Sequence, residues 1–186
     1  MMTIGVVKGM DANELYKRFT AGERNFQSTD LTGKDLSGID LSEIDLKGAI
    51  LRGANLQGTR LKGANLSKAN LSEADLSTAN LTGTSLYEAI LIGANLSRAQ
   101  LDLASLQAAT LTGTNLQEAN LIQTDLSQAD FSDANLTGVD LSQAKLQRTN
   151  FSRANLKQAD LRTAVFDRVI LSDATMPDGS KYCAST

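Results

Sequence analysis

Residues 64–76 read Ala-Asn-Leu-Ser-Lys-Ala-Asn-Leu-Ser-Glu-Ala-Asp-Leu, a five-residue unit that is repeated along most of the 186-residue chain. In steps of five from Phe26 to Leu171, all 30 positions hold Leu or Phe, and only four of them hold Phe. The residue two places earlier is most often Ala, and the residue one place earlier is most often Asn or Asp. A register of this length, without insertion or deletion, predicts one repetitive architecture.

The five-residue period excludes both regular secondary structures as the repeating element. On an α-helix, five residues advance about 500°, so successive Leu side chains would spiral around the axis. On a flat strand, an odd period would point successive Leu side chains to opposite faces. The Leu residues share one side only if the chain turns once per repeat, with Asn, Asp, Ser, Thr and Gly at the corners. The pattern therefore predicts a β-solenoid with Leu and Ala inside and polar groups outside.

Runs such as residues 64–76 resemble the pentapeptide-repeat family, whose pattern is A-(D/N)-L-X-X, and the chain looks like a cyanobacterial-type member. The resemblance covers residues 25–176 and implies an all-β, right-handed, quadrilateral β-helix of about 7.5 coils. The residue pattern alone does not choose the number of sides. Ile50, Ile90 and Ile170 fall on a 20-residue column, whereas the outward glycines cluster slightly better at a spacing of 15. Four sides are therefore what the resemblance implies.

The chain divides into an N-terminal segment (1–24), the repeat region (25–176) and a C-terminal tail (177–186). Within the first segment, about residues 11–21 read as a short helix that caps the solenoid. Asp11 is suited to the N-cap, and Leu15 and Phe19 lie four apart on one face. We expect Leu15 and Phe19 to cover the first coil, because a solenoid exposes sheet edges at its ends.

The far end of the repeat region carries unusual apolar residues. Val165 and Ile170 occupy outward positions that elsewhere hold mostly Asn or Asp, and Phe166 adds bulk beside them. We interpret these three residues as candidate end-packing or dimer contacts. The favoured interpretation is that the tail folds over this end and the protein is a monomer. The alternative is a dimer through the last coil, as in some members of the family.

Composition argues against an enzyme. The chain has no His, one Cys and no Trp, so the commonest general base and metal ligand is missing. No phosphate-binding loop or zinc motif occurs, and Ser and Thr have no His partner for a hydrolase triad. Four corner acids, at positions 30, 35, 40 and 45, match the repeat consensus and should point in different directions. We therefore expect no catalytic residue, no metal site and no cofactor.

The middle of the repeat region is the best candidate for a binding surface. Residues 69–144 contain nine acidic residues and one basic residue, although the whole chain carries a net charge of only −3. The same stretch carries unusual outward apolar residues, and clusters of such residues favour binding. The candidate partner surface consists of Tyr87, Ile90, Ile92, Leu103 and Ile122.

These observations predict a non-enzymatic protein that binds another protein as an interaction or regulatory scaffold. The alternative, from the family resemblance, is a DNA mimic that binds a type II topoisomerase such as gyrase. The small net charge favours no direct nucleic-acid binding. No apolar stretch is long enough to span a membrane, and the start does not read as a signal peptide, so we expect a cytoplasmic protein without membrane contact.

Overall fold

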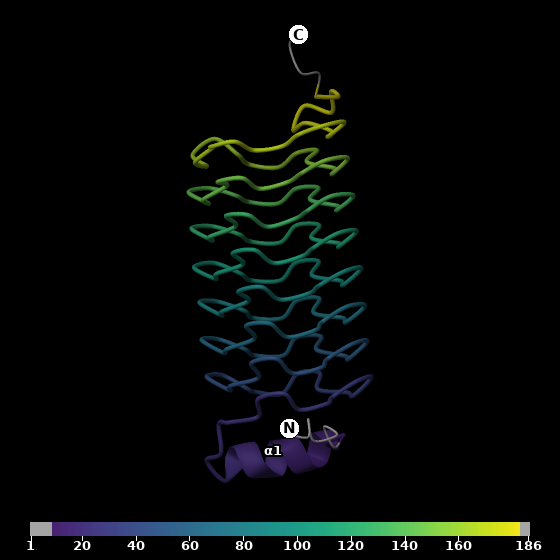
Figure 1. The fold of residues 1–186 in the computed structure, drawn as a ribbon, viewed down its shortest axis with the longest axis vertical. Helices are drawn as coiled ribbons and strands as arrows, with labels where there is room; N and C mark the ends of the chain where they lie inside the picture. Colours follow the sequence, from purple (N-terminus) through teal and green to yellow (C-terminus); the bar gives the residue numbers. More distant parts are fainter. Residues whose placement is uncertain (1–8, 183–186) are drawn as a thin grey trace, which may run out of the picture.

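The computed structural model describes residues 9–182, which form a rod of stacked coils with one helix at its base (Figure 1). The helix, α1, spans Ala12–Thr20, and the coils follow it from Asn25 to Thr175. Each coil uses 20 residues, because every bridging residue pairs in parallel with the residue 20 positions later, from Asn25–Asp45 to Asn155–Thr175. The predicted right-handed, four-sided β-helix with a helical cap is confirmed.

Each pentad forms one side of a coil and one corner. The residue before each Leu, which is usually Asn or Asp, makes the β-bridge and faces outward, and the strand on each side is reduced to this single bridging residue. The next two residues after the Leu form the turn. The second turn residue takes a positive φ in coil after coil, as at Gly63 (67°) and Glu73 (62°). This left-handed conformation explains why Gly recurs at that position, since Gly adopts it without a steric cost.

We number the four sides from the first coil. Side 1 begins at Asn25, side 2 at Asp30, side 3 at Asp35 and side 4 at Asp40, and each side continues in steps of 20 residues. The corners take the numbers of the sides that they join. Corner 4–1 thus leads from side 4 of one coil into side 1 of the next.

The interior is a continuous column of Leu side chains with Ala or Thr beside them, and most of these Leu and Ala residues are fully buried. Two aromatic residues, Phe131 and Phe151, stack in adjacent coils with ring centroids 5.2 Å apart. The buried Thr hydroxyls donate to main-chain carbonyls of the preceding coil, as from Thr59 to Leu36 (2.7 Å) and from Thr124 to Leu101 (3.0 Å). Among residues 9–182, every buried side-chain nitrogen or oxygen has a hydrogen-bond partner, so the core is satisfied in its hydrogen bonds.

Helix α1 closes the N-terminal end. Asp11 is its N-cap, and the Asp11 carboxylate accepts a hydrogen bond from the Asn13 N–H (3.3 Å). Leu15 is fully buried and Phe19 is almost so, and both belong to the same apolar cluster as Phe26. The amphipathic spacing seen in the sequence thus places the two side chains over the first coil.

The C-terminal end is covered only in part. The chain reverses at Asp178–Gly179, so that the Met176 N–H donates to Ser180 O and Lys181 pairs antiparallel with Thr175. This hairpin lies over the side that ends at Thr175, and Phe166 keeps 48% of its surface exposed. The tail was predicted to fold over this end, and its described part, residues 177–182, lies over the side that ends at Thr175 and leaves Phe166 exposed. Residues 1–8 and 183–186 lie outside the described residues.

Within residues 9–182, α1 is too short and too polar to cross a membrane, and no other helix there meets that requirement.

Candidate functional site

The 20-residue register places the five predicted surface residues on two adjoining sides of the rod. Tyr87 lies at corner 1–2, Ile90 on side 2 and Ile92 at corner 2–3 of the same coil. Leu103 and Ile122 lie at corner 4–1, in successive coils. The surface therefore runs from corner 4–1 across side 1 and side 2 to corner 2–3, and Tyr87 stands where the two sides meet.

Exposure separates this surface from the remaining coils. Between residues 26 and 160, the large apolar residues with substantial exposure are Leu103 (60%), Ile92 (47%), Tyr87 (39%) and Ile90 (38%). All four fall within 17 consecutive residues, which is less than one coil. Ile122 is half-buried. Between residues 26 and 160, one coil of an otherwise polar surface thus carries the exposed apolar groups.

Leu103 occupies the second position of its turn, with a φ of 62°. In the same column, the two preceding coils have Gly63 and Gly83, and the two following coils have Gln123 and Gln143. The Leu103 N–H donates to Ile122 O across the coils (3.1 Å), which holds the two apolar residues side by side. The conformation of Leu103 was not predicted, although the glycines in its column were a signal for it.

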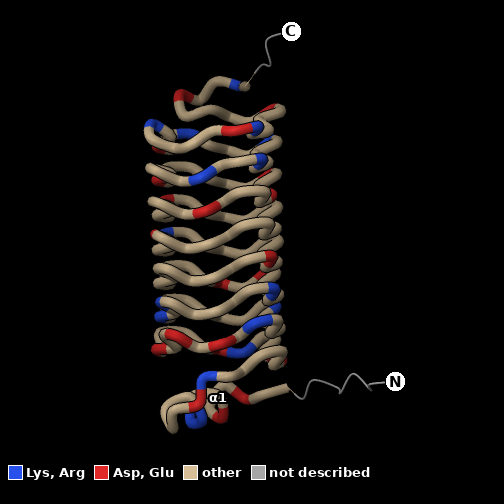
Figure 2. The backbone as a smooth tube through the Cα atoms, turned by 60° about the vertical axis from the view of Figure 1, so that its left-hand side comes forward, with Lys and Arg blue, Asp and Glu red and all other residues tan. Residues whose placement is uncertain are grey.

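Ion pairs connect neighbouring coils and neutralise much of the acidic middle. Five of the nine acids in residues 69–144 have a basic partner within 4.0 Å: Glu73, Glu88, Glu118, Asp125 and Asp133, paired with Arg52, Lys68, Arg98, Lys145 and Arg153 respectively. All of these pairs are partly exposed, so each contributes little to stability. Lys and Arg are concentrated in the coils toward the two ends of the rod (Figure 2). Among residues 9–182, Asp75, Asp102, Asp130 and Asp140 form no ion pair.

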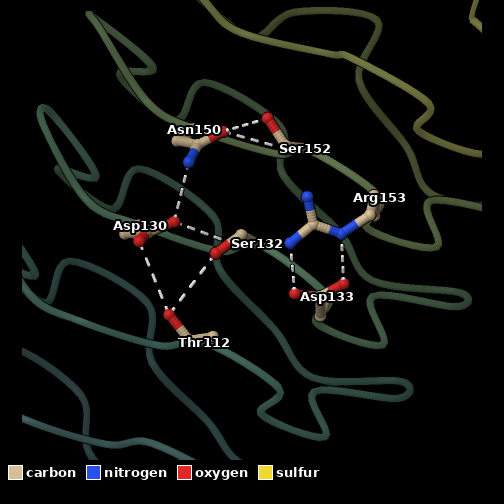
Figure 3. A network of polar contacts seen from close by, with 7 residues as sticks. All are labelled: Thr112, Asp130, Ser132, Asp133, Asn150, Ser152 and Arg153. Carbon is tan, nitrogen blue, oxygen red and sulfur yellow. Dashed lines mark hydrogen bonds and ion pairs between the residues drawn. The ribbon is translucent and has the colours of Figure 1, made fainter.

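The bridging Asn and Asp side chains form polar ladders along the sides. In Figure 3, the Asp130 carboxylate accepts hydrogen bonds from the Ser132 N–H (3.0 Å) and from the Asn150 amide of the next coil (3.0 Å). Beside it, Arg153 binds the Asp133 carboxylate through two nitrogens (2.7 and 2.6 Å). These contacts fix the corner and join the coils. These carboxylate and amide groups thus serve to stabilise the fold.

The corner acids at the N-terminal end have the same structural use. Asp30, Asp35, Asp40 and Asp45 each accept the N–H of the residue two positions later. The pKa of Asp40 is lowered to about 2, first by the Ser42 hydroxyl and N–H and then by Arg60 in the next coil. Among residues 9–182, no cluster of three or more acidic or Cys side chains has the geometry of a metal site.

Ile92 borders a shallow surface depression of about 480 Å³, together with Gly93 and the Arg52–Glu73 ion pair. A more polar depression of about 300 Å³ lies at corner 3–4 and includes Ser97 and Arg98. Both are open to solvent and lined by exposed residues or residues of the ladders.

The candidate end contacts remain accessible on the last coil. Val165 (52%) and Ile170 (48%) face outward at the ends of sides 1 and 2. Phe166 holds a position that is buried in the preceding coils, but no further coil covers it in the described chain. These three residues form an apolar surface that is separate from the middle one.

Comparison with known proteins gives one family. The family model described as pentapeptide repeats matches residues 25–58, 39–77, 69–107, 104–143 and 144–178. No curated protein matches the chain.

Among solved structures, HetL, a pentapeptide repeat protein involved in heterocyst differentiation regulation in Nostoc sp. strain PCC 7120, is 31% identical. The match covers 93% of this chain and all of HetL, with a TM-score of 0.42. A trypsin-treated form of QnrB1, a plasmid-mediated fluoroquinolone resistance protein, is 22% identical over 84% of this chain and 79% of its own, with a TM-score of 0.55. Rfr23, a pentapeptide repeat protein from the cyanobacterium Cyanothece 51142, is 28% identical. The match covers 83% of this chain and 98% of Rfr23, with a TM-score of 0.34.

Proposed function

Because the chain belongs to the pentapeptide-repeat family, we propose that it is a non-enzymatic scaffold that binds another protein through the surface from Tyr87 to Ile122. The rod is straight and regular, and repeat proteins of this kind present extended surfaces to their partners. We also propose that this binding serves regulation or assembly. We place the protein in the cytoplasm as part of the same proposal. HetL, whose described role is regulatory, is a member of the same family.

The observation that carries this proposal is that, between residues 26 and 160, the exposed large apolar side chains are confined to one coil. Outside that coil, the outward positions between residues 26 and 160 hold mainly residues that form ladders, corner hydrogen bonds or ion pairs. Clustered apolar groups on a polar surface mark binding sites, whereas isolated ones are ordinary. Tyr87, Ile90 and Ile92 lie within six residues of each other and satisfy the condition of clustering.

The absence of catalysis in this proposal is supported by how the reactive groups are used. The buried Thr hydroxyls donate to carbonyls, and the corner carboxylates accept main-chain N–H groups. A nucleophile or a general base needs a free lone pair directed at a substrate, and these groups direct theirs at the backbone.

A pull-down from a lysate of the source cell tests the proposal. The variant Ile90→Lys, Leu103→Lys, Ile122→Lys is compared with the wild-type chain after circular dichroism has established that both are folded. The matched control replaces three exposed glutamines of later coils, Gln143, Gln147 and Gln158, and each of them becomes Lys. We expect a protein to be captured by the wild type and the control but not by the first variant. Equal capture by all three would place the binding site elsewhere on the rod.

A second candidate function is a DNA mimic that binds a type II topoisomerase. The nine acids of residues 69–144 favour it, since a row of carboxylates can imitate the phosphates of duplex DNA. The ion pairs weigh against it, because five of those acids are already paired with a base. A gyrase supercoiling assay decides between the two functions, and inhibition at micromolar protein would favour the mimic.

We further propose that the protein is a monomer, and that Val165, Phe166 and Ile170 are end residues and not dimer contacts. The hairpin of residues 176–182 already binds part of this end, through the Tyr182 N–H and Ala174 O (2.8 Å). Light scattering should give the monomer mass for the wild type and for Val165→Asn with Ile170→Asn. A wild-type dimer that the two substitutions split would contradict this proposal.

A further inference from the structure

Leu103 is the most exposed large apolar residue among residues 9–182, and it stands in a backbone conformation that does not favour it. Nineteen non-glycine residues there have a positive φ, and apart from Leu103 they are polar, charged or Ala. An L-residue in the left-handed region is strained relative to Gly, which the chain uses at the same position in the two coils below. Folding gives no reason for Leu at this position, and such an outlier is a sign of function.

The surroundings leave Leu103 protruding from the rod. Directly below it in the column are Gly83 and Gly63, which have no side chains, and a Cβ added to Gly83 would meet no atom within 4 Å. Ile122 lies at the same corner in the coil above, next to the main chain of Leu103. The corner therefore places Leu103 next to Ile122, above two turns whose second residue is Gly.

An unpaired carboxylate lies beside this pair. Among the outward and corner residues of sides 4 and 1 in three successive coils, 80–87, 100–107 and 120–127, the charged residues are Asp102 and Asp125. Asp125 is paired with Lys145 of the next coil (3.7 Å), so Asp102 carries the unpaired charge. Asp102 is next to Leu103, and its carboxylate accepts a hydrogen bond from the Thr82 hydroxyl (2.9 Å) but forms no ion pair within the described chain.

The apolar residues of side 2 differ in this respect. Near Ile90 and Ile92, Glu88 is paired with Lys68, and Glu73 is paired with Arg52. The carboxylates beside these two isoleucines are thus paired, whereas Asp102 beside Leu103 is not. Corner 4–1 therefore places the exposed Leu103 and the half-buried Ile122 next to a carboxylate that has no basic partner within residues 9–182.

We propose that Leu103 and Ile122 are the anchor of a docking surface, and that the partner is a protein segment whose apolar side chains are flanked by Lys or Arg. This inference deepens the proposed function, on which it rests, by assigning the anchor and the chemistry of the partner. The aliphatic pair supplies the apolar contact. The unpaired Asp102 carboxylate attracts a flanking basic group, which raises the rate of association and disfavours acidic partners.

Two substitutions at Leu103 remove the anchor without harm to the fold. Leu103→Gly restores the residue of the two coils below, and Leu103→Gln restores the residue of the two coils above. Both should melt within about 4 °C of the wild type. Gln158→Gly is the matched control, because it removes an exposed side chain from the same turn position (φ 61°) at corner 3–4, outside the proposed surface.

The binding probe is a displayed library of random 16-residue peptides, selected on the immobilised wild-type chain. We expect selected peptides to be rich in aliphatic or aromatic residues together with Lys and Arg. By fluorescence anisotropy, the strongest of them should lose about tenfold or more in affinity with Leu103→Gly and Leu103→Gln, but not with Gln158→Gly. Raising the salt concentration should also weaken binding.

Three results would overturn the inference. The first is enrichment of acidic peptides, and the second is binding that Leu103→Gly and Leu103→Gln leave unchanged. The third is the failure of any peptide to bind the wild-type chain. Each of these leaves the scaffold function to be judged separately by the pull-down, in which the captured partner is a whole protein.

Discussion

Leu103 and Leu106 lie three residues apart in the same coil, yet they belong to two different regions of the molecule. Leu106 is fully buried in the interior column, whereas Leu103 keeps 60% of its surface exposed at corner 4–1. Leu106 stands at a position where the five-residue register requires a buried Leu or Phe. Leu103 stands at a turn position that elsewhere holds Gly, Ala or a polar or charged residue. Residues that keep the five-residue register therefore account for the fold, whereas residues that depart from the register are the best candidates for a specific function.

Leu106→Ala should have the largest effect, because it breaks the interior column. Removal of a fully buried Leu side chain costs about 2–5 kcal/mol, depending on how far the cavity collapses. The free energy of unfolding from urea titration measures this loss. A loss below about 1 kcal/mol would mean that the column is loosely packed, and the contrast with the corner would disappear.

Phe166→Ala sharpens the comparison, because Phe166 has the register of Leu106 and an exposure closer to that of Leu103. With 48% of its surface exposed, Phe166 should contribute about 1–2 kcal/mol, roughly half of what a buried aromatic contributes. The fully buried Phe151 is the matched control, and Phe151→Ala should cost about 3–5 kcal/mol. Equal losses in the two variants would indicate that the C-terminal end is covered in solution.

Asn115→Ala tests an outward residue that does serve the fold. The Asn115 side chain donates to the Asn95 amide oxygen (3.2 Å) and accepts from the Asn135 amide (3.1 Å) and the Gln117 N–H (3.2 Å). Loss of these exposed bonds should destabilise the rod by about 1 kcal/mol. If the free energy of unfolding in urea does not change, the ladder does not stabilise the rod. Asn115 would then be, like Leu103, an outward residue that does not serve the fold.

The pKa of Asp40 predicts a smaller effect that depends on pH. Since folding lowers this pKa from 3.8 to about 2, the carboxylate stabilises the protein above about pH 4, and this contribution is lost as the pH falls toward 2. Asp40→Asn should therefore make the urea midpoint less sensitive to pH between 4 and 2. An unchanged slope would mean that Ser42 and Arg60 do not hold the carboxylate in solution.

The sequence predicted the repeat region closely, because its period excludes other regular structures. The number of sides could not be read from the residues, and the glycine spacing pointed weakly to 15. The structure gives the reason. A positive φ that favours Gly recurs at the corners of all sides, so the spacing of the glycines marks the turns and does not indicate how many residues form a coil. The columns are set by the bridges 20 residues apart, as from Ile50 to Asn70 and from Asn70 to Ile90.

The candidate surface was predicted residue by residue, but its shape was not. Outward apolar residues stand out in a strict register, so Tyr87, Ile90 and Leu103 could be named without a structure. Their division between side 2 and corner 4–1 needs the coil register, and the pairing of charges needs the contacts between coils. The exposure of Phe166 was not foreseen, because it depends on the reversal of the chain at Asp178–Gly179.

The free energy of unfolding of Leu103→Gly, measured by urea titration beside Leu106→Ala, tests the central claim that the exposed corner residue serves binding and not folding. We predict that Leu103→Gly lies within about 1 kcal/mol of the wild type, since relief of the left-handed backbone offsets the lost contacts. Leu106→Ala should be at least about 2 kcal/mol less stable than the wild type. A loss for Leu103→Gly as large as that for Leu106→Ala would contradict the claim and make Leu103 a structural residue.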